Sequence, residues 1–213
     1  MRRPLRSYLN PSSLVMVGIP KSMVDLTLND YSVKECPELR DVKSFFGDYI
    51  KNLDNNFESN RGIFLYGSNG VGKTMLASII LKEAYRHRYT VRRCTFVDYM
   101  TQYTRVWSAR SAEEKESAED NLFTYYKATE FLVLEEVGKE IDSKAAAPIL
   151  EDLLRYREDK GYVTIICTNL NLDLMTERYG ASIMSLLKGN TVPIRIESAD
   201  KRNRTFKKRG VKP

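Results

Sequence analysis

Apolar and polar positions divide most of the chain into short apolar runs and longer segments with helical spacing. Strands are expected from the apolar runs at residues 62–67, 91–99, 131–136, 162–169 and 192–197. Helices are expected from the 3.6-residue spacing at 37–53, 73–87 and 144–161, with another passing through Tyr103 and Trp107. Because strands that alternate with helices favour right-handed crossovers, the pattern predicts a three-layer α/β domain around a mostly parallel five-stranded sheet.

Some segments depart from this pattern. Turn-forming residues are expected to close the first helix after residue 53, and Pro148 is expected to break the helix at 144–161 near its start. The polar stretch 108–121 favours an exposed loop or a helix end. The first 30 residues contain several prolines and little periodicity. We therefore expect an extended arm at 1–30, one domain at 31–200 and a basic tail at 201–213.

Composition places the chain among ordinary folded proteins. Its 213 residues are 42% apolar and 29% charged, as in one globular domain. No apolar run approaches the roughly 20 residues of a membrane span, and the N-terminus lacks the apolar core of a signal peptide. We expect a cytoplasmic protein that makes no membrane contact. Cys94 and Cys167 lie in apolar runs and are expected to be buried, which fits a reducing compartment.

Positive charge is gathered into three groups along the chain, whose formal net charge is +6. The groups comprise Arg2, Arg3 and Arg6; Arg86, His87, Arg88, Arg92 and Arg93; and Lys201, Arg202, Arg204, Lys207, Lys208 and Arg209. Such clusters favour an anionic partner such as nucleic acid. The alternative is that these side chains are the solvated ends of helices and strands and a frayed tail.

A phosphate-binding motif connects the first predicted strand to the helix that follows it. Gly67, Gly72, Lys73 and Thr74 satisfy G-x-x-x-x-G-K-[ST]. In this motif backbone N–H groups surround a phosphate at a helix N-terminus, the lysine reaches the outer phosphates, and the threonine hydroxyl binds Mg²⁺. The sequence therefore predicts an ATP and Mg²⁺ site. Its nucleotide-binding residues are expected to be Gly67, Ser68, Asn69, Gly70, Val71, Gly72, Lys73, Thr74 and Met75.

Polar side chains follow two other predicted strands, at the sheet edge where the carboxyl ends of parallel strands meet. Glu135 and Glu136 end the run at 131–136, and Asn169 ends the run at 162–169. We expect Glu135 to hold Mg²⁺ together with Thr74, directly or through water, and Glu136 to polarise the water that attacks the γ-phosphate. Asn169 is expected to contact the γ-phosphate or that water. The alternative for each is an ordinary polar residue at a strand end.

These motifs, with GIPK at 18–21, Arg155-Tyr156 and the segment YVTIICTN at 162–169, resemble the AAA+ ATPases of the DnaC and DnaI helicase-loader group and their IstB transposition relatives. The resemblance covers about residues 18 to 204. It implies a RecA-like AAA+ ATPase domain at 31–200 without a full C-terminal lid domain. It also implies ATP-dependent remodelling or holding of a replicative DNA helicase, contact with single-stranded DNA, and contact between copies of the chain.

The sequence departs from that family at the positions of two arginines. The family pattern resembles RYGERI-x-SRL, whereas this chain has Ser182 and Leu186 at the arginine positions. The second of these is the finger that reaches a neighbouring subunit's ATP, and such a finger is worth about 10³ to 10⁵ in turnover in GTPases. We therefore expect a weak ATPase, with Arg178 as the nearest substitute. The closing family pattern is kept as Asp200 and Arg202, and Arg202 is a candidate γ-phosphate sensor.

A second departure lies near the start of the chain. Loaders of this group carry a helicase-binding domain ahead of the GIPK motif, and here 17 residues precede it. If a helicase docks on this chain, we expect the arm and its apolar residues 14–17 to take part. Tyr99, Tyr103 and Trp107 are candidates for stacking on DNA bases, although helical spacing of aromatic residues is more typical of a core.

The residues leave three other functions open. A transposition accessory ATPase like IstB would act on duplex DNA. A small-molecule kinase would need an arginine-rich lid and an acceptor pocket, neither of which is recognisable in the sequence. An adaptor that binds ATP as a switch and scarcely hydrolyses it is favoured by Ser182 and Leu186 at the arginine positions.

Overall fold

A single parallel sheet organises the computed structural model, which describes residues 4–33, 36–140 and 143–197. Five strands are hydrogen-bonded in the order β2-β3-β4-β1-β5, and all neighbouring pairs are parallel. The strands are β1 (Gly62–Gly67), β2 (Val91–Thr95), β3 (Phe131–Val137), β4 (Val163–Thr168) and β5 (Thr191–Ile196). The predicted fold class and number of strands are confirmed. β1, which ends in the phosphate-binding motif, lies between β4 and β5 near the middle of the sheet.

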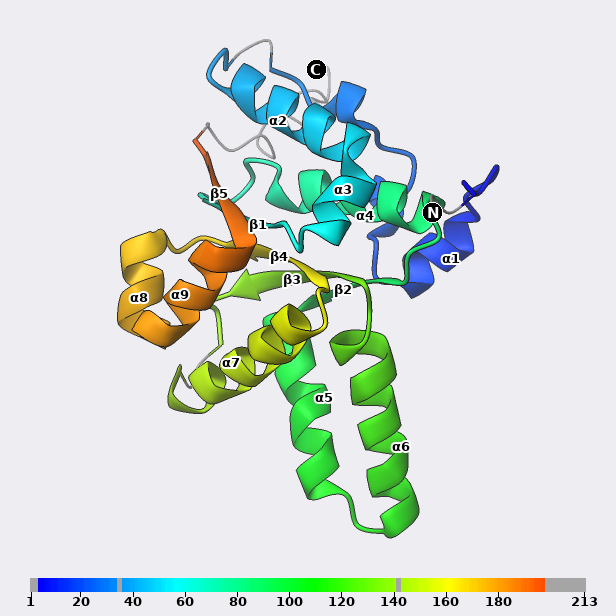
Figure 1. Cartoon of the computed structure of the whole chain (residues 1–213), viewed down its shortest axis with the longest axis vertical. Helices are drawn as coiled ribbons and strands as arrows, with labels where there is room; N and C mark the ends of the chain where they lie inside the picture. Colours follow the sequence, from blue (N-terminus) through cyan, green and yellow to red (C-terminus); the bar gives the residue numbers. More distant parts are fainter. Residues whose placement is uncertain (1–3, 34–35, 141–142, 198–213) are drawn as a thin grey trace, which may run out of the picture.

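Helices cover both faces of the sheet and complete the three layers (Figure 1). One face is covered by α2 (Leu39–Lys51), α3 (Leu53–Glu58) and α4 (Lys73–Arg86); the other is covered by α5 (Phe96–Ser108), α7 (Ser143–Asp159), α8 (Leu172–Tyr179) and α9 (Ala181–Asn190). Two apolar cores follow from the alternation of side chains along the strands. Ile63 and Leu65 belong to the core under α4, whereas Phe64 belongs to the core under α7.

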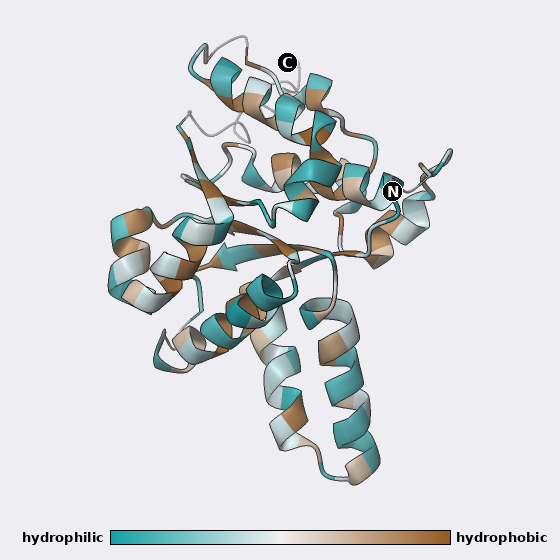
Figure 2. Cartoon of the chain, in the orientation of Figure 1, coloured by the Kyte–Doolittle hydropathy of each residue, from teal (hydrophilic) through white to brown (hydrophobic). Residues whose placement is uncertain are grey.

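A helical hairpin projects from the second face. It pairs α5 with α6 (Ala112–Leu122), and α6 leads into a π-helical turn, Phe123–Lys127. The hairpin points away from the sheet, and α6 is hydrophilic along most of its length (Figures 1 and 2). The only buried residue of α6 is Leu122. The hairpin therefore adds exposed surface to the domain and contributes little to its core.

The two elements of this hairpin differ from the sequence expectation. The strand predicted at 91–99 ends at Thr95, because Thr95 and Asp98 form a capping box that starts α5 at Phe96. The predicted loop or helix end at 108–121 is instead a helix of its own from Ala112, capped by the Ser111 side chain on the backbone N–H of Glu114. Both helix starts carry Ser or Thr three residues before an acid, a recognisable capping signal.

The first helix closes near the predicted position, because α2 ends at Lys51, whereas the predicted break at Pro148 was wrong. The expected closing turn after residue 53 contains the short helix α3. Pro148 lies inside α7, which continues to Asp159. After Pro148 this helix buries Leu150 and Leu153 against the sheet, and that packing offsets the one backbone hydrogen bond a proline removes. Among the described residues, no helix is long and apolar enough to cross a membrane.

The N-terminal arm is less extended than predicted. It contains α1 (Pro11–Met16) and the 3₁₀ turns Lys21–Met23 and Leu28–Asp30. Pro11 begins α1, where its fixed backbone angle is favourable. Of the expected docking residues 14–17, Leu14 is buried in the core, and Val15 and Met16 are exposed. The arm is thus packed on the domain, and a smaller apolar surface than expected is open to a partner.

Candidate nucleotide-binding site

The phosphate-binding loop lies between the end of β1 and the start of α4, as predicted, and its backbone is held by Tyr31, which directly follows the arm. Gly72 has φ 104°, and a Cβ at this position would lie 2.8 Å from the ring of Tyr31. The Tyr31 hydroxyl donates a hydrogen bond to the Val71 carbonyl oxygen (3.3 Å). Burial raises the pKa of Tyr31 to about 12. Tyr31 was not predicted as a site residue.

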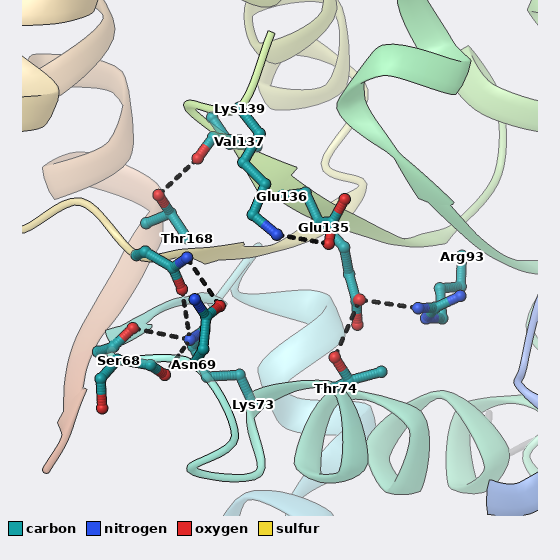
Figure 3. A network of polar contacts seen from close by, with 12 residues as sticks. Ser68, Asn69, Lys73, Thr74, Arg93, Glu135, Glu136, Val137, Lys139 and Thr168 are labelled. Carbon is teal, nitrogen blue, oxygen red and sulfur yellow. Dashed lines mark hydrogen bonds and ion pairs between the residues drawn. The ribbon is translucent and has the colours of Figure 1, made fainter. Parts of the chain in front are cut away.

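The Lys73 ammonium lies over this loop (Figure 3). It donates hydrogen bonds to the carbonyl oxygens of Gly67 and Ser68 (both 2.7 Å) and to Asn169 Oδ1 (2.8 Å). The Asn169 amide in turn donates to Asn69 Oδ1 (3.0 Å). The predicted Asn169 is therefore brought to the loop from the end of β4, next to the cation expected to bind the outer phosphates.

Glu135 and Thr74, the two residues predicted to hold Mg²⁺, are in contact. The Thr74 hydroxyl donates to Glu135 Oε2 (3.0 Å), and the Arg93 guanidinium donates to the same oxygen (2.7 Å). The other carboxylate oxygen, Glu135 Oε1, is buried and has no hydrogen-bond partner among the described residues. A buried carboxylate oxygen without a donor, beside a hydroxyl, is a donor set that suits a hard divalent cation such as Mg²⁺.

A bulge in β3 separates the two adjacent acids. Leu134 pairs with Ile166 and Val137 pairs with Thr168, so β3 has one residue more than β4 between these pairs. Glu136 is in the left-handed region, with φ 59°. Its side chain is 46% exposed and forms an ion pair with Lys139 (2.7 Å). The bulge therefore leaves Glu135 buried and turns Glu136 toward solvent.

These side chains line one cavity of about 230 Å³. Its walls include Lys73, Thr74, Met75, Glu135, Glu136 and Asn169 from the predicted set, and Met23 and Lys139, which were not predicted. The phosphate loop contributes Asn69, Gly70 and Gly72. Met23 comes from the arm, which therefore forms part of the wall. A cation, a hydroxyl, two carboxylates and an amide around one space can bind a phosphate chain with its metal ion and orient a water molecule.

The structure does not place Arg178 in this cavity. Its side chain pairs with Glu140 (Nε to Oε1, 2.9 Å), to which the Tyr179 hydroxyl also donates a hydrogen bond. That hydrogen bond to Glu140 raises the pKa of Arg178. Glu140 also accepts from the Gly138 backbone N–H (3.0 Å). Within this chain Arg178 therefore ties α8 to the loop that follows β3.

Leu186 and Ser182, which stand where the family pattern has arginines, lie in different surroundings from each other. Leu186 is partly buried against the core under α7. The Ser182 hydroxyl donates to Glu151 (2.8 Å), which Arg155 also contacts. The predicted sensor Arg202 and its neighbour Asp200 lie outside the described residues, as do the rest of the basic tail, Arg2 and Arg3.

The middle basic cluster is largely engaged within the chain. His87 pairs with Asp54, and Arg88 and Arg92 donate to the backbone carbonyls of Pro4 and Met16. Arg93 points inward to Glu135. The contacts with Asp54 and Glu135 therefore offset part of the positive charge of this cluster, and Arg88 and Arg92 keep theirs.

The predicted aromatic residues of α5 differ in exposure. Tyr99 is fully buried and Tyr103 is partly buried, whereas Trp107 is 73% exposed. Trp107 is therefore the member of this set that is open to stacking. The cysteine prediction is confirmed, because Cys94 and Cys167 are both buried.

A comparison with known protein families decides which P-loop group this site belongs to. The family model of the IstB-like ATP binding proteins matches residues 13–188. The chain belongs to this family. The match includes the phosphate loop, both acids of β3 and Asn169, and it starts within the arm.

Relatives of this IstB-like protein include helicase loaders. It is 25% identical over 177 residues to the replicative helicase loader DnaC of Escherichia coli (strain K12), which covers 82% of this chain and 68% of the relative. It is 22% identical over 169 residues to the replicative helicase loader DnaI of Bacillus subtilis (strain 168), covering 73% and 52%. A crystal structure of the DnaC helicase loader superimposes with a TM-score of 0.68 at 21% identity, covering 84% of this chain and all of the other. The fold is therefore the AAA+ P-loop fold.

Proposed function

We propose that this IstB-like protein binds ATP and Mg²⁺ in the cavity between the phosphate loop and the ends of β3 and β4, and hydrolyses the ATP. The observation that supports this most is the convergence of Lys73, Thr74, Glu135, Glu136 and Asn169 on that one space. These residues come from three separate segments, at the start of α4, in β3 and after β4, and each has a side chain suited to its role. If the acids and Asn169 were only ordinary polar residues at strand ends, nothing would require Asn169 to contact Lys73 over the phosphate loop.

The site residues divide the chemistry among them. Lys73 binds the outer phosphates, and Thr74 and Glu135 hold the metal ion, which neutralises charge on the phosphate oxygens when it is bound. Glu136, half exposed at the bulge, accepts a proton from the attacking water. Asn169 orients that water or a γ-phosphate oxygen. Before it acts, Glu136 must leave its ion pair with Lys139, and the binding of a nucleotide supplies new partners for that lysine.

We further propose that ATP binding lets the protein hold a replicative DNA helicase and single-stranded DNA. The sequence relation to the loaders DnaC and DnaI supports this partner. Surfaces available for the contacts are Val15 and Met16 on the arm and Trp107 on α5, all of which are exposed. The weak ATPase activity that we expect has a physical basis at Leu186, which cannot stabilise charge on a neighbour's ATP and packs against its own core.

This function is tested by nucleotide-dependent assembly. The protein is mixed with the replicative helicase of its host and with labelled single-stranded DNA, with ATP or without nucleotide, at several salt concentrations. We expect complexes that require ATP and weaken as salt rises. Lys73→Ala should abolish the ATP dependence. Binding that is indifferent to both ATP and salt would contradict the proposal, and a preference for duplex DNA would support a transposition accessory ATPase instead.

The second candidate is an adaptor that binds ATP as a switch. Leu186 and Ser182 at the arginine positions favour it, since neither offers a positive charge. Arg178, the nearest substitute, is held by Glu140 in its own chain. An adaptor would bind ATP and assemble with its partner without turnover, so hydrolysis measured with and without the partner separates the two candidates.

A further inference from the structure

Arg93 lies on β2, which β3 and β4 separate from the strand of the phosphate loop, and its side chain crosses to β3 instead of pointing to solvent. The side chain is 18% exposed. One terminal nitrogen donates to Glu135 Oε2 (2.7 Å), and the other donates to the Gly18 carbonyl oxygen (2.9 Å). Arg93 Nε is buried without a hydrogen-bond partner among the described residues. A permanent positive charge is therefore fixed beside the carboxylate expected to bind Mg²⁺.

The arm holds Arg93 in this position from the backbone side. The Arg93 backbone N–H donates to the Val17 carbonyl oxygen (2.8 Å). Gly18 has φ 98°, and a Cβ there would lie 2.1 Å from the Arg93 carbonyl oxygen. Only glycine lets the arm approach β2 this closely. Because backbone and guanidinium are both bonded to the arm, the charge stays beside Glu135.

The same Glu135 oxygen accepts hydrogen bonds from Thr74 and from Arg93. A divalent cation held by Thr74 and Glu135 would have the guanidinium as a close neighbour of like charge, which lowers its affinity. Without a metal ion, the guanidinium neutralises Glu135, which would otherwise repel the phosphates in a poorly hydrated site. Arg93 therefore weakens the binding of Mg²⁺ and strengthens the binding of a nucleotide that carries no metal ion.

We propose that Arg93 is a built-in counter-cation of the metal site, which lets the protein hold ATP without Mg²⁺ and weakens its binding of Mg²⁺. The proposal rests on the proposed function, because it concerns the same nucleotide site. A purely structural Arg93 would join the arm to β2 and leave the metal dependence of binding unchanged.

The test is equilibrium binding of a fluorescent ATP analogue in EDTA and across a Mg²⁺ titration. Arg93→Gln keeps a hydrogen-bond donor and removes the charge, and Arg93→Lys keeps the charge. We expect Arg93→Gln to bind the analogue about tenfold more weakly in EDTA and to reach half-saturation at about tenfold less Mg²⁺. Arg93→Lys should resemble the wild type. Equal metal dependence in all three proteins, or an Arg93→Lys that behaves like Arg93→Gln, would overturn the proposal.

A second variant keeps the test independent of how well Arg93→Gln folds. Glu135→Gln leaves Arg93 unpaired beside the phosphates, so it should bind the analogue in EDTA more tightly than the wild type does. Equal or weaker binding would overturn the proposal. A wild type that binds no analogue in either condition would instead refute the proposed nucleotide site, so the two failures are distinguishable.

Discussion

Replacing Arg157 by methionine should destabilise the fold far more than replacing the exposed Arg155 on the same helix. Arg157 is fully buried at the end of α7, and burial lowers the pKa of its guanidinium. Among the residues that the structure describes, no carboxylate is a hydrogen-bond partner of Arg157. The guanidinium donates to the Thr164 hydroxyl and to four backbone carbonyl oxygens, those of Tyr126, Lys127, Thr129 and Val163. It therefore joins the π-helical turn at the base of the hairpin to β4.

The magnitude follows from what the methionine leaves behind. Each buried carbonyl oxygen that loses its donor costs roughly 1–3 kcal/mol. Against this, the variant no longer buries a charge, which recovers several kcal/mol. We expect a net loss of about 3–5 kcal/mol in the free energy of unfolding, as for other buried charged groups whose networks are broken. For a chain of this size that corresponds to a fall in Tm of roughly 6–20 °C.

Thermal and urea unfolding followed by circular dichroism measures this loss, with Arg155→Met as the matched control. Arg155 lies two positions away on the same helix, is exposed, and pairs with Glu151. An exposed pair of this kind contributes about 0–1 kcal/mol. If Arg157→Met and Arg155→Met have the same unfolding free energy, the reasoning about the buried donor network is refuted.

Three other substitutions have defined outcomes. Glu136→Gly should be more stable than Glu136→Ala by about 1 kcal/mol in denaturant titrations, because glycine accepts φ 59° without strain; equal stabilities would show that the bulge is unstrained. Burial raises the pKa of Tyr31 to about 12. The contribution of the neutral hydroxyl to folding stability is therefore complete below pH 10 and falls by about 2 kcal/mol as pH rises to 12. Tyr31→Phe should lose less stability over that interval, and an unchanged pH profile would contradict this. Trp107→Ala should weaken single-stranded DNA binding by about 1–3 kcal/mol at an unchanged Tm; full DNA binding would remove Trp107 from the interface.

The sequence predicted the parts of the fold that depend on local pattern. Buried parallel strands such as Val163–Thr168 are continuous apolar runs, and the phosphate loop is defined by glycine and lysine at fixed spacing. The errors arose where capping or tertiary packing overrides composition. Residues 112–122 look like a loop by polarity, yet Ser111 and the acids that follow start a helix, and Pro148 is tolerated because α7 is packed on the sheet.

The candidate site could be predicted only in part for a related reason. Strand ends of a parallel sheet converge, so Glu135 and Asn169 could be placed beside the loop from the sequence. The partners of those residues depend on contacts between distant segments. Arg93, Tyr31 and Met23 reach the site through packing of β2, of the arm and of the segment that directly follows it, and no spacing rule links them to the phosphate loop.

Steady-state ATP hydrolysis, measured with and without single-stranded DNA, tests the central claim most directly. Wild type, Lys73→Ala and Glu136→Gln are compared, with binding of a fluorescent ATP analogue measured in parallel. The account predicts slow hydrolysis that DNA stimulates, loss of binding and turnover in Lys73→Ala, and retained binding without turnover in Glu136→Gln. Hydrolysis that persists in Glu136→Gln, or analogue binding that is unaffected in Lys73→Ala, would contradict it.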